Sequence, residues 1–203
     1  MDVSPHALLA ALGRARAPIL WIGCTYVLSV AVGAGMVHAH NGFALRCRDN
    51  LVGKARQTAV GKAMNGGMPL RAAVGDFTGN LFLGAVPSTV MGLAVVMPFP
   101  WVAFRGWVGG IVSVDGEHIS RLRDGRERVY YLGVLLLQLI PYTLAGGTGV
   151  RLGLASLFPK GRWRYPPERW MGLPAEGVRD VGRIYLLVVP MFLIASLVEF
   201  LTR

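Results

Sequence analysis

The side chains that could support metal or nucleophilic chemistry are few, and their spacing favours neither. His38 and His40 are two positions apart, so on a helix they project about 200° from each other and cannot readily share a metal. Ser88 lies in Val-Pro-Ser-Thr-Val rather than Gly-x-Ser-x-Gly, without a neighbouring base. Cys24 and Cys47 lack Cys-x-x-Cys spacing. We therefore predict no catalytic residue, no metal site and no cofactor, and a protein that is not an enzyme.

Two charged residues, Arg151 and Glu199, lie inside apolar stretches. An ionised side chain at the centre of a membrane helix costs about 2.5–3.5 kcal/mol, but each residue is within about three turns of the end of its stretch, where long side chains reach the headgroups. We expect a lipid phosphate to be the partner of Arg151. Glu199 is expected near the opposite surface, paired with Arg203 rather than with Arg151. Both would position helices instead of transferring protons or substrates.

The amino-acid composition is more apolar than that of a water-soluble protein. Of its 203 residues, 53% are apolar and 16% are charged, and the mean hydropathy is +0.48, whereas a soluble domain has about a quarter of its residues charged. This argues against a soluble enzyme. The excess of 21 Lys and Arg over 11 Asp and Glu would suggest nucleic-acid binding in a soluble protein, but in a membrane protein basic loops contact anionic lipids. We expect contacts with membrane lipids and none with nucleic acid.

Four apolar blocks are long enough to predict membrane spans. They cover residues 17–39, 81–97, 129–158 and 184–201. The first exceeds the roughly 7–15 residues of the apolar region of a signal peptide, so we interpret it as a retained span. Together the blocks predict an all-α fold, a polytopic transmembrane helix bundle of four spans that forms a single integral membrane domain over residues 1–203.

A fifth apolar block, residues 101–114, is short and contains Arg105. Pro98 and Pro100 stand before it and remove two backbone donors, so we predict that the preceding helix does not continue to residue 114. The block could be a short fifth span, a re-entrant segment or an interfacial helix, because length does not separate these alternatives.

The polar segments 41–80 and 159–183 carry most of the basic residues. With four spans they share one side of the membrane, whereas a fifth span puts them on opposite sides, so the orientation stays open. Within the first segment, residues 54–64 have the composition of a basic helix lying on headgroups, with a solvated loop as the alternative. The second interleaves arginines with aromatic residues, which is typical of an anchor at headgroup level.

Glycine forms the clearest pattern. Gly146, Gly147, Gly149 and Gly153 crowd one end of the block 129–158. Gly149 and Gly153 form a Gly-x-x-x-Gly step, which lets another helix approach closely. We predict that this face packs against a helix of this chain or of a partner, with a pore-lining or substrate-contact role as the alternative.

Several short motifs lie between residues 78 and 199. They are Thr-Gly-Asn-Leu at 78–81, Arg-Gly at 105–106, Val-Gly-Gly at 108–110, the stretch 135–153 and the stretch 186–199. Together they resemble the stage II sporulation protein M family of integral membrane proteins. Where that family tends to carry Asn-Gly, this chain has Arg105-Gly106, and where it often carries His-Gly followed by Glu, this chain has Val134-Leu135 and Gln138. A role that rests on that His or Glu does not transfer to this chain.

The resemblance implies a non-catalytic, multi-pass protein of a prokaryotic cytoplasmic membrane that helps to organise a peptidoglycan-remodelling complex. We accordingly predict an assembly or scaffold subunit whose partners are other membrane proteins or a second copy of the chain. The candidate interaction or helix-packing residues are Asn80, Arg105, Gln138, Gly146, Gly149, Arg151, Gly153 and Glu199.

A small transporter or permease component is the alternative function. The two differ in whether Gln138, Tyr142, Thr143 and Thr148 line a water-filled cavity or are bonded to neighbouring helices. An intramembrane enzyme would need a convergent acid and base, for which the sequence offers no candidates.

Overall fold

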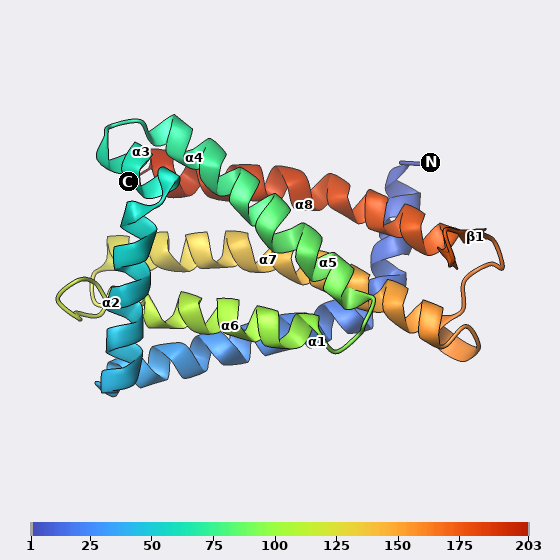
Figure 1. The fold of residues 1–203 in the computed structure, drawn as a ribbon, viewed down its shortest axis with the longest axis horizontal. Helices are drawn as coiled ribbons and strands as arrows, with labels where there is room; N and C mark the ends of the chain where they lie inside the picture. The colour runs from blue at the N-terminus through green and yellow to red at the C-terminus, as the bar shows by residue number, and fades with distance from the viewer. Residues whose placement is uncertain (1, 203) are drawn as a thin grey trace.

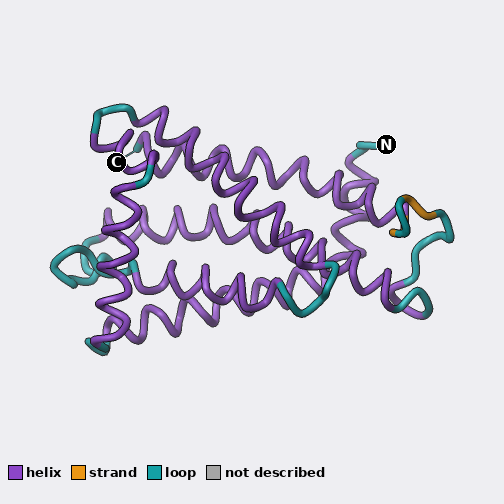
Figure 2. Tube along the Cα trace, viewed as in Figure 1, coloured by secondary structure: helices purple, strands orange, loops and turns teal. Residues whose placement is uncertain are grey.

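The chain forms a bundle of helices in the computed structural model, which describes residues 2–202 (Figure 1). Nearly all of the secondary structure is helical (Figure 2). The α- and π-helices are α1 (Pro5–His38), α2 (Gly42–Gln57), α3 (Ala59–Asn65), α4 (Pro69–Thr78), η1 (Gly79–Ala85), α5 (Val86–Gly92), α6 (Pro98–Ile111), α7 (Gly125–Leu157) and α8 (Ala175–Leu201). Between α7 and α8 lie a 3-10 turn, η2 (Gly161–Trp163), and an antiparallel pair of strands, β1 (Arg169–Trp170) and β2 (Leu173–Pro174). The prediction of an all-α fold is confirmed.

Three of these helices, α1, α7 and α8, are long and apolar enough to cross a membrane. Each begins before the apolar block that predicted it. Hydropathy marks the part of a helix that lipid can surround, whereas the ends of the helix depend on caps. At the start of α7, for example, the Asp124 side chain accepts a hydrogen bond from the Glu127 amide, which satisfies one of the free donors of the first turn.

The bounds predicted for the second span, residues 81–97, are wrong. Its residues are divided among η1, α5 and the turn that follows, and α4, η1 and α5 follow one another directly from Pro69 to Gly92. The π-helical widening in η1 has a local cause. Pro87 lacks an N–H group and its ring crowds the carbonyl four residues earlier, and just before it the Val86 amide donates to the Leu81 carbonyl, five residues back.

The chain reverses between α5 and α6, at residues 93–97. Val95 has a φ of 60° there, and Pro98 and Pro100 lie in the first turn of α6, where a missing N–H group is tolerated. The predicted interruption before residue 114 is therefore present, although the prolines begin α6 rather than end α5. From this turn α6 runs back toward the end of the bundle at which α4 begins (Figure 1).

The reversal places the two basic segments at opposite ends of the bundle. α2 and α3 lie where α1 ends and α7 begins, and the β1–β2 hairpin lies at the other end (Figure 1). This is the arrangement expected when α6 counts as a fifth pass. Residues 54–64, for which a basic helix and a solvated loop were both open, are helical on either side of Thr58, which separates α2 from α3 and caps α3 by accepting from the Gly61 amide.

Glycines let the helices approach closely at two helix–helix interfaces. α1 and α6 run in the same direction, and a Cβ on Gly110 would lie 2.2 Å from the Val30 carbonyl oxygen. α5 and α7 also run in the same direction, and a Cβ on Gly149 would lie 2.3 Å from the Thr89 carbonyl oxygen. No side chain fits at such distances, so these contacts require glycine. Gly106 with Gly110 is a second Gly-x-x-x-Gly step, which our reading of the sequence did not single out.

Candidate functional site

A chain of hydrogen bonds inside the bundle joins five side chains from five helical elements. Arg105 of α6 donates to the Tyr142 hydroxyl of α7, which donates to Asn80 Oδ1 of η1 at 2.6 Å. Asn80 Nδ2 donates to Asp76 Oδ2 of α4 at 2.9 Å. The Ser196 hydroxyl of α8 donates to the same oxygen at 2.7 Å. From Arg105 to Asp76, each hydrogen bond is donated in the same direction, from the guanidinium toward the carboxylate. We call the five residues the central chain: Arg105, Tyr142, Asn80, Asp76 and Ser196.

Close packing holds the central chain in place. Tyr142 is 1% exposed and meets Phe192 edge to face. The Arg105 guanidinium lies 4.5 Å from the ring centroid of Tyr142 and 5.2 Å from that of Trp101, so cation–π attraction adds to the hydrogen bond. Gly84 leaves room for this pair, because a Cβ there would lie 2.6 Å from the Tyr142 hydroxyl and 3.1 Å from Arg105 Nη2.

Gly84→Ala should therefore displace the Tyr142–Arg105 pair and destabilise the protein. Overpacking of a filled interior costs about 1–3 kcal/mol. Unfolding of the purified protein in detergent, followed by circular dichroism, measures the loss. Gly79→Ala is the matched control in the same π-helical element, because nothing lies within 4 Å of a Cβ at Gly79. Equal stability of the two variants would contradict the prediction.

A second polar contact joins α7 to the last turns of α8. Gln138 Nε2 donates to Glu199 Oε2 at 2.8 Å, and the Tyr130 hydroxyl donates to the Glu199 backbone carbonyl at 2.6 Å. Arg203, the predicted ion-pair partner of Glu199, lies outside the described residues.

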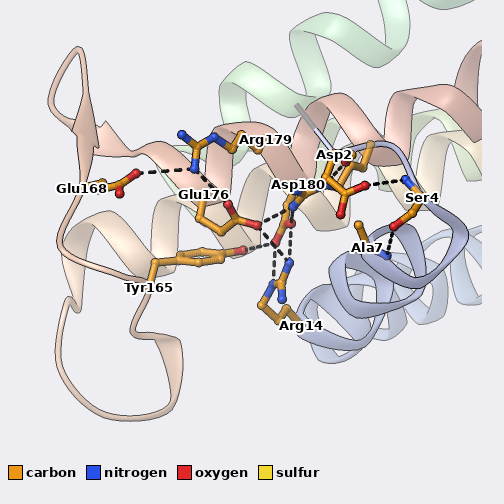
Figure 3. A network of polar contacts seen from close by, with 10 residues as sticks. Asp2, Ser4, Ala7, Arg14, Tyr165, Glu168, Glu176, Arg179 and Asp180 are labelled. Atoms are coloured by element: carbon orange, nitrogen blue, oxygen red, sulfur yellow. Dashed lines mark hydrogen bonds and ion pairs between the residues drawn. The ribbon is translucent and has the colours of Figure 1, made fainter.

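Charged side chains tie the start of α1 to the start of α8 at the other end of the bundle (Figure 3). Asp180, which is 1% exposed, accepts two hydrogen bonds from Arg14 at 2.7 and 2.6 Å, one from Arg183 at 2.9 Å and one from the Tyr165 hydroxyl at 2.8 Å. Glu176 adds ion pairs to both arginines. Two guanidinium groups thus compensate a buried carboxylate. We call Arg14, Glu176, Asp180 and Arg183 the charged cluster.

Tyr165 connects the charged cluster to the segment between α7 and α8. It is a buried side chain, and burial together with the nearby Asp180 carboxylate raises the pKa of its phenol above the ordinary value. Both causes act by disfavouring the charged phenolate. Tyr165 therefore stays protonated at neutral pH and keeps its hydroxyl available as a donor to Asp180.

Arg151 does not reach a lipid phosphate, contrary to our expectation. It is 3% exposed, and it donates to the Arg14 carbonyl at 3.1 Å and to the Trp163 carbonyl at 2.8 Å. Its guanidinium also lies 4.2 Å from the ring centroid of Tyr165. The segment that follows α7 folds over this side chain, so Arg151 meets main-chain acceptors before it can reach the surface. Its contacts position α1 and that segment against α7.

The glycine-rich face of α7 packs against two helices of the same chain. It meets α5 through Gly149 and Gly153, and a Cβ on Gly153 would lie 2.4 Å from a carbonyl oxygen of α5. It meets α1 through Gly147, where a Cβ would lie 2.5 Å from the Ile19 Cα atom. A Cβ on Gly146 would lie 3.0 Å from the Ser88 hydroxyl. The approach is within the chain and does not need a partner protein.

A cavity of about 350 Å³ lies between α6 and α7 beside the central chain. It is lined on one side by three residues of α6 and by the residue that directly follows this helix, namely Trp101, Arg105, Val108 and Val112. On the other side it is lined by Gln138 and Tyr142 of α7. We call it the α6–α7 cavity. Gln138 and Tyr142 thus both line a cavity and bond to neighbouring helices.

The two threonine side chains of α7 are bonded within the helix. The Thr143 hydroxyl donates to the Leu139 carbonyl and the Thr148 hydroxyl to the Leu144 carbonyl, both at 2.7 Å. Among residues 2–202, no three His, Cys, Asp or Glu side chains come together as a metal site. The acceptors of the central chain already hold donors, so the arrangement stabilises buried charge.

Our reading of the sequence missed the two carboxylates around which these groups gather. Asp76 precedes Asn80 by four residues, and this helical spacing could have indicated a shared polar face. Asp180 and Arg14 are 166 residues apart, and no sequence signal connects them. Of the residues that were predicted, the structure joins Asn80 to Arg105 through Tyr142.

Comparison of the chain with protein-family models, with curated proteins and with solved structures found no match. The assignment of function rests on the residues and their geometry.

Proposed function

We propose that this chain is a non-catalytic assembly or scaffold subunit of a membrane complex. The observation that supports this function is the bonding of the polar side chains of α7. Gln138, Tyr142, Thr143 and Thr148 each donate a hydrogen bond to another group of the chain. Polar groups that line a transport pathway must exchange their partners with a passing solute. Here Gln138 and Tyr142 instead join α7 to other helical elements, and the two threonines are satisfied within α7.

We place five passes in the membrane: α1, the continuous α4–η1–α5 helix, α6, α7 and α8. Large apolar side chains on the outside of the bundle suit contact with lipid or with another membrane protein; Leu28 and Leu83, for example, are 66% and 73% exposed. α2 and the β1–β2 hairpin then lie at opposite surfaces, where their basic residues contact lipid headgroups.

The resemblance to the stage II sporulation protein M family adds a setting to this proposal. It suggests a prokaryotic cytoplasmic membrane and a complex that remodels peptidoglycan. The partners are then other membrane proteins of the cell envelope, or a second copy of this chain.

One observation favours the alternative of a small transporter or permease component. The α6–α7 cavity has Arg105, Gln138 and Tyr142 in its wall, and polar side chains around a cavity at membrane depth are typical of solute sites in transporters.

Glu199→Gln distinguishes the two functions. In a scaffold it should retain both the co-purifying partner and the cellular phenotype, because an amide oxygen still accepts from Gln138, and the hydrogen bond from Tyr130 goes to the backbone carbonyl of residue 199. The measurement is quantitative mass spectrometry of proteins that co-purify with the tagged chain in mild detergent, together with complementation of a deletion strain. An unrelated tagged membrane protein of similar size controls for non-specific capture.

If Glu199 takes part in transfer, the opposite result is expected for the same variant. It requires that a stable and correctly inserted Glu199→Gln protein be inactive in complementation, since an amide cannot carry a proton in exchange for a solute. That result would contradict the scaffold function in favour of the transporter.

A further inference from the structure

The α6–α7 cavity has an elongated, mostly apolar wall. Three residues of α6 and the C-cap residue that follows it are spaced three and four positions apart: Trp101, Arg105, Val108 and Val112. They therefore form a single stripe on one face of the helix. At about 1.5 Å per residue, this stripe is about 16 Å long. Leu51 of α2 also lines the cavity.

Arg105 is the one charged residue in this wall. It takes part in none of the ion pairs between residues 2–202, and the carboxylate of the central chain is reached only through Tyr142 and Asn80. A guanidinium in apolar surroundings is costly when no anion compensates it. Its planar set of donors matches a carboxylate or a phosphate.

Two donors beside the cavity have no acceptor. Arg105 Nε and Trp101 Nε1 are both buried, and neither has a hydrogen-bond partner among the described residues. Buried donors in folded proteins are nearly always satisfied. Both residues line the cavity at the same end of the α6 stripe, but these two atoms are fully covered, so the donors that a ligand can reach there belong to the rest of the Arg105 guanidinium.

The remaining wall and the volume determine what else the ligand must contain. Val108, Val112, Leu51 and the aromatic side chains offer apolar contact and no charge. A volume of about 350 Å³ is the space of about a dozen water molecules at roughly 30 Å³ each. The ligand therefore has about a dozen non-hydrogen atoms, most of them apolar.

From the coincidence of an unpaired cation and an apolar slot, we propose that the α6–α7 cavity binds a single-chain amphiphile with one anionic head. The carboxylate or phosphate head bonds the Arg105 guanidinium, and the alkyl tail lies along Val108 and Val112. This ligand site is separate from the proposed assembly function and does not depend on it.

Binding of radiolabelled decanoate to the protein in phosphatidylcholine nanodiscs tests the proposal, with empty nanodiscs as the background. Decyl phosphate should compete with decanoate, because it has the same charge type and tail. Decanol and decyltrimethylammonium, which lack the anion, should compete at least about tenfold less well. Acetate, which lacks the tail, should not compete at equal concentration. Decanol or acetate competing as well as decyl phosphate would overturn the proposal.

Variants locate the site. Arg105→Gln should weaken decanoate binding by about 10- to 100-fold, the usual effect of losing a hydrogen bond to a charged group. Arg128→Gln is the matched control, because Arg128 is an exposed arginine of α7, and it should bind as the wild type does. Binding by Arg105→Gln within twofold of the wild type would overturn the proposal.

Val108→Phe keeps the test decisive if Arg105→Gln does not fold. It fills the slot without touching the hydrogen bonds of the central chain, and it should reduce decanoate binding to the level of empty nanodiscs. Undiminished binding by a folded Val108→Phe protein would place the ligand elsewhere and would also overturn the proposal.

Discussion

Asp180→Ala is expected to destabilise the protein by about 3–5 kcal/mol, the usual cost of removing one partner of a buried ion pair. Asp180 is 1% exposed and is bonded by Arg14, Arg183 and Tyr165. Without its carboxylate, Glu176 is the one anion of the charged cluster left to pair with two guanidinium groups. Denaturant titration of the purified protein in detergent, followed by circular dichroism, measures the change.

Glu168→Ala is the control for this prediction. Glu168 also pairs with an arginine, Arg179, but its side chain is 67% exposed and the two groups are 3.4 Å apart. Exposed pairs contribute little, so the loss should stay within about 0.5 kcal/mol. Similar losses for the two variants would show that the charged cluster does not hold α1 to α8.

Gly149→Leu should prevent α5 and α7 from reaching their native contact. A Cβ at this position would lie 2.3 Å from the Thr89 carbonyl oxygen, so the backbones must separate before any side chain can fit. We expect a loss of at least about 3 kcal/mol, at or above the upper end of the usual cost of overpacking. The same titration, together with the yield of monodisperse protein, measures the effect.

Gly133→Leu is the matched control on the same helix, because nothing lies within 4 Å of a Cβ at Gly133. It should leave stability unchanged or raise it slightly, since leucine favours a helix over glycine by up to about 1 kcal/mol. Leu152→Phe would be a poorer control, because Leu152 is buried and its side chain lies near Gly177. Equal losses at Gly149 and Gly133 would contradict the packing role.

Several features of this protein follow from the sequence by itself, because each depends on neighbouring residues. Long apolar blocks with few charged residues predict helices that lipid can surround, and the α-helical class is confirmed. Two prolines within three residues predict an interruption near residue 98, and the chain reverses there. The spacing of Gly149 and Gly153 predicts a close helix contact, although it does not say with which helix.

Other features are decided only by the tertiary structure, because they depend on which helices meet. Arg151 was expected at a lipid phosphate, and it bonds two carbonyl groups that folding brings to it from α1 and from the segment after α7. Asp180 and Arg14 become partners only when the first and last helices of the bundle pack together. The same holds for the central chain, in which the guanidinium of Arg105 and the carboxylate of Asp76 are joined through side chains of two further helical elements. No local pattern encodes such pairings, since a buried charge finds its partner through the packing of whole helices rather than through sequence spacing.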